Sequence, residues 1–143
     1  MVSLDERFTQ ALHGGARAWR GALDRRLRAR GLTAAGWSAM AAVTASAAPL
    51  SQRELARQLG VDGATLVATI DRLAAASLVE RMPSLEDRRV KLVVLTERGK
   101  ALAHEVEDFA ATLRRQLTAR IDSGRIVVAA EVLEELRQIL EGA

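Results

Sequence analysis

The chain has 143 residues, enough for one domain with a core of its own and too few for two large domains. It contains no cysteine, which excludes disulfides, thiolate metal sites and thiol-based redox chemistry. Its net charge of +3 is only mildly basic, so overall charge does not by itself indicate a nucleic-acid partner. Aromatic residues make up 3% of the chain, so we expect a core of aliphatic side chains in closely packed helices.

The first residues carry neither the basic nor the apolar region of a signal peptide, and no apolar run is long enough to cross a membrane. We therefore expect a cytoplasmic protein without a membrane partner. A long helix is predicted from Asp5 to about Arg30, because apolar residues recur every three or four positions. Residues 17–30 of this helix hold six arginines and one aspartate, and the role of this stretch stays open. Thr33 is the expected cap of a second helix that ends near Ala45.

Two short capped helices are predicted next. Ser51 and Glu54 have the spacing of a capping box, and Gly60 can take the left-handed conformation that ends a helix. Asp62 is the expected N-cap of the helix that follows. Two helices joined by a short turn containing glycine form a helix-turn-helix, whose second helix can enter the major groove of DNA.

A β-hairpin is predicted after the helix-turn-helix. Residues 78–82 and 90–95 are short segments rich in β-branched residues, as half-buried strands are. The connection between them, residues 83–89, is too long for a tight turn and is charged towards its end. A helix-turn-helix followed by such a hairpin is a winged helix. The expected fold class is therefore mainly α with a small β part (α+β): a winged helix-turn-helix with long flanking helices.

Two further helices are predicted at the C-terminal end, one capped by Thr96 and one from Arg125 to Glu141. Each carries an apolar stripe, and the winged helix alone cannot bury the three stripes of the outer helices. Packing within one chain is one interpretation, and a symmetric dimer with interlocked outer helices is the preferred one. We expect one domain over residues 1–143, with a DNA-binding lobe at 33–95 and dimerisation helices at 1–32 and 96–143.

Several short motifs occur in a fixed order along nearly the whole chain. They are Gly31, Leu32 and Trp37 around the start of the second helix, Leu66, Ile70 and Leu73 in the fourth helix, Leu78 to Arg81, Asp87-Arg88-Arg89, and Leu95 to Gly99. In this order and spacing, the segment resembles the MarR family of bacterial transcription regulators. The resemblance implies a homodimer that binds a pseudo-palindromic operator in double-stranded DNA, and a small aromatic or phenolic effector.

The residues expected to contact DNA lie on the recognition helix, on the wing and at the start of the preceding helix. On the recognition helix, the side expected to be buried is formed by Leu66, Val67, Ile70 and Leu73. The hydroxyls of Thr65 and Thr69 can donate to bases or phosphates. The expected DNA contacts are Gln52, Arg53, Gly63, Ala64, Thr65, Ala68, Thr69, Arg72, Arg88 and Arg89.

In the wing, the family resemblance suggests that Asp87 pairs with Arg89 and positions it for the minor groove, where arginine senses groove width. Two plainer interpretations stay open for these surfaces. The recognition helix can present small residues merely because the protein is rich in alanine, and the wing can be a solvated charged hairpin tip.

A ligand site is expected, from the resemblance, in a cleft between the outer helices and the winged lobe. Its candidate residues are Arg17, Trp19, Arg20, Trp37 and Met40, and the alternative is that both tryptophans anchor the core. No residue spacing matches a catalytic group, a phosphate loop or a metal site, so we expect neither enzyme activity nor a cofactor.

Together these features predict a dimeric transcription regulator, expected to act as a repressor that a small ligand relieves. The alternatives are a winged-helix regulator without such an effector, a protein-interaction module and a small-molecule carrier.

Overall fold

A computed structural model describes residues 1–142 of the chain. Backbone contacts divide the chain into two units, Met1–Val106 and a second that begins at Glu107. Mainly helical structure with one small antiparallel sheet confirms the expected fold class. The proposed division into a DNA-binding lobe and dimerisation helices stays a prediction. In chain order, the elements are α1 (Leu4–Ala29), α2 (Ala34–Ala45), β1 (Leu50–Ser51), α3 (Gln52–Leu59), α4 (Gly63–Ala75), β2 (Val79–Pro83), β3 (Lys91–Leu95), α5 (Glu97–Arg120) and α6 (Ser123–Glu141).

Local sequence signals begin and end the short helices as predicted. Ser51 and Glu54 form a reciprocal capping box at the start of α3, and Gly60 ends that helix in the left-handed conformation with φ 68°. Asp62 caps α4 by accepting a hydrogen bond from the backbone N–H of Thr65 at 2.7 Å. Thr33 caps α2 in the same way. These caps satisfy backbone donors that a helix start otherwise leaves free.

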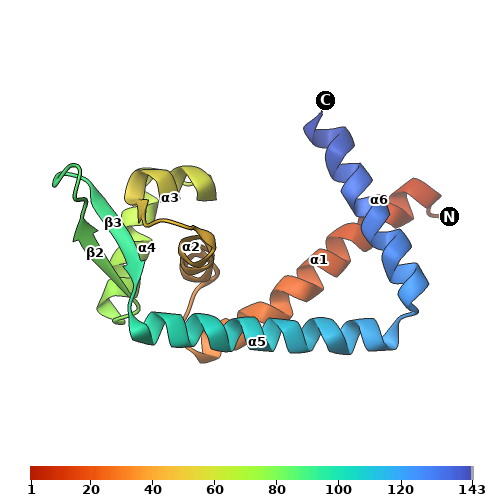
Figure 1. The fold of residues 1–143 in the computed structure, drawn as a ribbon. Helices are drawn as coiled ribbons and strands as arrows, with labels where there is room; N and C mark the ends of the chain where they lie inside the picture. Colours follow the sequence, from red (N-terminus) through yellow and green to blue (C-terminus); the bar gives the residue numbers. More distant parts are fainter. Residues whose placement is uncertain (143) are drawn as a thin grey trace. The chain divides into compact units, whose positions relative to one another are not determined.

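The sheet has three strands in the order β1-β3-β2. Strands β2 and β3 form the predicted hairpin, which Figure 1 shows extending beside α4 as the wing. Strand β1 was not predicted, because two residues are too few to show an alternating pattern. It pairs Leu50 with Val93 and Ser51 with Leu92, which joins the start of α3 to the centre of the sheet.

The core of the first unit lies where α2, α3 and α4 meet the sheet. Side chains from all four are completely or almost completely buried there, and they interlock as aliphatic residues without polar atoms. The largest are Met40, Leu55, Leu66, Ile70 and Val93. This packing sets the position of α4 relative to the wing.

The second unit contains the C-terminal half of α5 and all of α6. Asp122 caps α6 by accepting from the Arg125 backbone N–H at 3.1 Å, so the helix begins two residues before the predicted start. None of the described residues of α6 is buried. Leu133 is 44% exposed and Leu140 is 67% exposed, so the predicted stripe of α6 lies open in the single chain.

Arg81, on β2, ties three elements together. Its Nε donates to Oε1 of Gln52 on α3 at 2.7 Å, and its Nη2 forms an ion pair with Oδ1 of Asp71 on α4 at 2.7 Å. The same Nη2 donates to the backbone carbonyl of Val67 at 3.4 Å. The Arg81 side chain is only 28% exposed, whereas that of Asp71 is 60% exposed, so the guanidinium is partly shielded from water and the carboxylate is not.

Replacing Arg81 with methionine keeps the aliphatic stem and removes all three contacts. We expect the free energy of unfolding to fall by about 1–2 kcal/mol, because charged hydrogen bonds in a partly shielded site are lost. Urea unfolding followed by circular dichroism measures this change. The matched control is Arg57→Met on the exposed surface of α3, which we expect to change stability by no more than about 0.5 kcal/mol. Equal stabilities of the two variants would contradict the structural role of Arg81.

Candidate nucleic-acid interface

The recognition helix α4 has a buried side that differs from the predicted one at two positions. The buried residues are Leu66, Thr69, Ile70 and Leu73, whereas Val67 is 40% exposed. The predicted burial of Val67 and the predicted exposure of Thr69 are therefore wrong. A helical seam repeats at three- and four-residue steps, and from Leu66 these steps reach position 69 but skip position 67.

The opposite side of α4 is exposed and small. Five of the residues predicted to contact DNA are exposed on α4: Gly63, Ala64, Thr65, Ala68 and Arg72. Both threonine hydroxyl hydrogens, however, are used within the protein. Thr65 donates to Asp62 Oδ2 at 2.9 Å, and Thr69 donates to the Thr65 carbonyl at 3.1 Å. In this structure neither hydroxyl hydrogen is free for DNA, and Arg72 is the long donor of this face.

Asp62 places a negative charge at the N-terminus of α4. The Thr65 backbone N–H, followed by the Thr65 hydroxyl, lowers the pKa of this carboxyl from its usual value. The folded pKa lies below the unfolded one, so the stabilising cap is complete at neutral pH and is lost as the pH falls through the lowered pKa.

The start of α3 presents two of the predicted DNA contacts. Arg53 is exposed, and Gln52 is half-buried. The carbonyl oxygen of Gln52 accepts from Arg81, which fixes the orientation of the side-chain amide. Its two N–H donors are then the part of the group that stays available for an acceptor. Sequence reasoning missed Arg81, because its partners lie in segments far from it along the chain.

The wing tip carries the predicted pair of Asp87 and Arg89, and the structure confirms that they are bonded. The Arg89 backbone N–H and Nε donate to Asp87 Oδ1 at 3.0 and 3.2 Å, and Nη2 donates to Oδ2 at 3.3 Å. The Arg89 guanidinium, with the Arg89 backbone N–H as the second cause, lowers the pKa of Asp87. The Arg89 side chain is nevertheless 91% exposed, so it is oriented at its base and open to a partner. Arg88 beside it is also exposed.

The residues predicted to bind a small ligand do not share one environment. Met40 has no exposed surface, which conflicts with its predicted role as a ligand contact, because a fully packed side chain is out of reach of a ligand. Trp37 is half-buried and packs against the core, which fits the anchoring interpretation. Trp19 is half-buried, whereas Arg17 and Arg20 are exposed.

Residues 1–142 contain no group of three or more histidine or carboxylate side chains placed to hold a metal ion. None of their helices is both long and apolar enough to cross a membrane.

Comparison with known proteins agrees with this geometry. A family model described as MarR family matches residues 30–90, from the end of α1 to the wing. The crystal structure of the transcriptional regulator PA3341 is 36% identical, with 95% of this chain and 99% of that chain covered and a TM-score of 0.76. Wild-type MarR from Escherichia coli is 25% identical, with 95% and 98% covered and a TM-score of 0.75.

A third match reports on the fold alone. A Staphylococcus aureus MepR variant bound to an oligodeoxyribonucleotide is 17% identical, with 93% of this chain and 97% of that chain covered and a TM-score of 0.70. The helix order, the wing and these matches have one explanation: the chain belongs to the MarR family of winged-helix, DNA-binding transcription regulators.

Proposed function

We propose that the protein binds a pseudo-palindromic operator as a homodimer and represses transcription until a small ligand weakens that binding. The observation that carries this proposal is the wing tip, where Asp87 holds a 91%-exposed arginine. An exposed guanidinium that is oriented by hydrogen bonds from its Nε and Nη2 to Asp87 suits a narrow minor groove, which concentrates negative potential. Beside the wing, α4 offers the exposed face that a major groove accepts.

Some of the DNA contacts proposed for this chain recognise the shape of the duplex, and others recognise its base sequence. In this proposal, Arg53 and the Gln52 amide contact phosphates, and Arg72 contacts a base edge or a phosphate. The small residues of α4 permit close approach, and Ala64 and Ala68 offer methyl groups for thymine. The same geometry supports Gly63, Thr65 and Arg88 as further contacts, with Thr65 acting as an acceptor or through its methyl group. Thr69, being buried, is not proposed again.

The proposed dimer is supported by apolar side chains that the single chain leaves open. In the first unit, Leu4 is 81% exposed and Phe8 is 39% exposed near the start of α1. In the second unit, Val128, Ile139 and Leu140 are more than half exposed on α6. Such surfaces favour association with a second copy. A two-fold dimer also presents two recognition helices, which lets a palindrome be read twice.

The proposed effector is a small aromatic or phenolic compound. A Staphylococcus aureus MarR of this fold is described in complex with salicylate and kanamycin, and CouR from Rhodococcus jostii is described bound to p-coumaroyl-CoA. These proteins are 20% and 24% identical to the present chain, so they support the class of ligand and not its identity. A ligand acts as an effector if it binds the DNA-free conformation more tightly than the DNA-bound one.

Arg89→Ala tests the role of the wing. We expect it to weaken specific DNA binding by about 1–3 kcal/mol, the usual contribution of a good groove contact, and Arg88→Ala to have a smaller effect. Gel-shift titrations on a duplex that the wild-type protein selects from a random pool measure both affinities. If Arg89→Ala binds this duplex as tightly as the wild type does, the wing is not a DNA contact.

Leu133→Asp tests the dimer. Burying an unpaired carboxylate at an apolar contact between helices costs several kcal/mol, so we expect this variant to sediment as a monomer and to lose tight operator binding. Gln138→Asp is the control, because it places the same charge on the same helix at a polar position. Analytical ultracentrifugation gives the oligomeric state, and circular dichroism shows whether each variant is folded. A wild-type monomer, or a folded Leu133→Asp dimer of unchanged stability, would overturn the proposal.

A further inference from the structure

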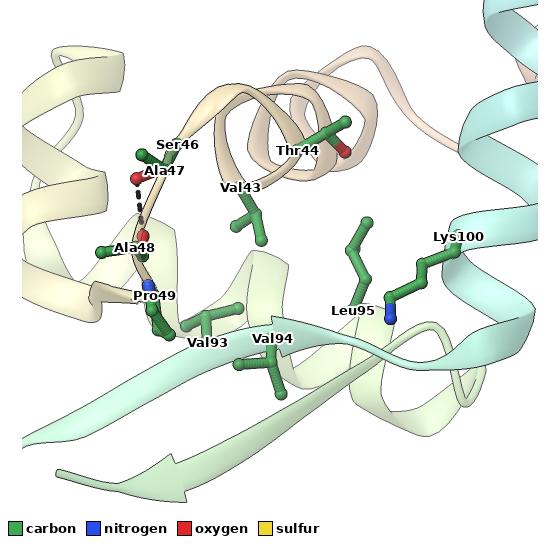
Figure 2. Close-up of a pocket in the computed structure, with 10 residues that line it drawn as sticks. All are labelled: Val43, Thr44, Ser46, Ala47, Ala48, Pro49, Val93, Val94, Leu95 and Lys100. Carbon is green, nitrogen blue, oxygen red and sulfur yellow. Dashed lines mark hydrogen bonds between the residues drawn. The ribbon is translucent and has the colours of Figure 1, made fainter. Parts of the chain in front are cut away.

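A hollow of about 460 Å³ lies in the first unit, and none of the residues that line it is proposed to touch DNA. Its walls are the end of α2, the connection from Ser46 to Pro49, the end of β3 and the first turns of α5, as Figure 2 shows. The volume falls within the usual range of small-molecule sites (~300–1,000 Å³). We call it the strand-end pocket.

The pocket exists because β1 stops after two residues. Leu50 pairs with Val93, and continued antiparallel pairing would bring Ala48 opposite Leu95. Ala48 does not pair in this way: its carbonyl accepts the Ser46 hydroxyl at 2.6 Å, a bond drawn in Figure 2. Among the described residues, no backbone hydrogen bond joins Leu95 to Ala48. The chain instead bends away from β3 and leaves a gap.

The edge of β3 inside this gap offers backbone groups. Thr96 donates to the Leu78 carbonyl at 3.1 Å, and Ser84 donates to the Val90 carbonyl at 2.9 Å, so the even-numbered residues of β3 face β2. Hydrogen-bonding groups alternate between the two edges of an antiparallel strand. The N–H and carbonyl of Leu95 therefore face the pocket, beyond the end of β1.

The side chains of the pocket define the chemistry of a ligand. In Figure 2, Val43 points from α2 towards the sheet and Leu95 points from β3 towards α2, and Pro49 adds a third apolar side chain to the lining. The hydroxyls of Thr44 and Ser46 are already donors to backbone carbonyls. The remaining polar groups include the ammonium of one lysine and the backbone N–H of Leu95, both of which are hydrogen-bond donors.

Lys100 is the cation of the pocket. Its Nζ lies 3.2 Å from Glu97 Oε1, but the two side chains are 61% and 91% exposed. An ion pair this exposed contributes little and is easily exchanged for another. Two of the three ammonium N–H groups remain for a second acceptor. The pocket thus combines apolar walls with a positive charge and a backbone donor near one end.

We propose that the strand-end pocket binds small carboxylates with an apolar body about the size of one aromatic ring. The carboxylate accepts from the Lys100 ammonium and the Leu95 N–H, and the ring packs between Val43, Leu95 and Pro49. This pocket would be the site of the effector in the proposed function. Ligand binding itself does not depend on that function; only the effect of the ligand on DNA binding rests on it.

The position of the pocket explains how occupancy reaches the DNA-binding elements. One wall leads within two residues to the Ser51 capping box, which begins α3 and places Gln52 and Arg53. The opposite wall is β3, whose other edge pairs with β2 and leads back to the wing. A ligand that widens the gap moves the DNA contacts at the start of α3 relative to those of the wing. By reciprocity, bound DNA weakens ligand binding by the same factor.

The test uses salicylate and its uncharged amide, salicylamide, as matched probes of the full chain. Two-dimensional ¹H–¹⁵N spectra should show saturable shifts of the Leu95 amide and of its pocket neighbours with salicylate. We expect salicylamide, and salicylate with Lys100→Met, to bind about 2- to 5-fold more weakly, since an exposed charge-assisted contact is lost. Lys100→Arg should bind nearly normally. Lys91→Met, which removes a lysine at the far end of β3, is the control and should bind like the wild type.

Ala48→Phe, which fills the pocket without changing charge, should abolish the Leu95 shift. The proposal is overturned if salicylate leaves Leu95 unchanged up to about 10 mM, where a millimolar ligand is mostly bound. It is also overturned if the shifts centre on Trp19 or Trp37, or if Lys100→Met and Lys91→Met bind equally. DNA titrations of the ligand-free variants separate the two claims. If the protein binds DNA normally but salicylate does not bind the pocket, only the pocket proposal is rejected. If salicylate binds the pocket but the protein binds no DNA, the proposed function as a DNA-binding regulator is rejected.

Discussion

The geometry of the DNA-binding face depends on Arg81, which joins β2 to both helices of the helix-turn-helix. Its contacts to Gln52 and Asp71, each 2.7 Å long, act together with the aliphatic core behind them. Hydrophobic burial in the core is non-directional and opposes separation of the helices from the sheet. The hydrogen bonds of the guanidinium are directional and fix how β2, α3 and α4 are aligned with one another. The wing, α3 and α4 are therefore joined by the Arg81 contacts as well as by the aliphatic core.

The surface proposed to face DNA offers few hydrogen-bond donors. The Thr65 and Thr69 hydroxyl hydrogens are used inside the protein, and the exposed face of α4 consists largely of small residues. Arg89 at the wing tip and Arg72 on α4 are long side chains with hydrogen-bond donors on this surface. We infer that shape and groove width contribute a large share of specificity in this protein, with direct base contacts confined to few positions.

Signals that act within a few residues could be read from the sequence. The caps at Ser51 and Asp62 and the turn at Gly60 were predicted correctly, because each depends only on its immediate neighbours. Features set by distant contacts were missed or misassigned. Strand β1 exists only through its pairing with β3, and the roles of Arg81 and Met40 depend on segments that meet in the folded chain. The wing pair was predicted because Asp87 and Arg89 are two residues apart.

The measurement that tests the account most directly is a hydroxyl-radical footprint of the wild-type protein on its selected duplex. Two recognition helices on a symmetric dimer should protect two patches whose centres lie about one helical turn, ~34 Å, apart. Flanking minor-groove protection should mark the two wings and should disappear with Arg89→Ala. A single short protected patch, or protection spread evenly along the duplex without any boundary, would contradict a dimer that reads a palindrome through paired winged helices.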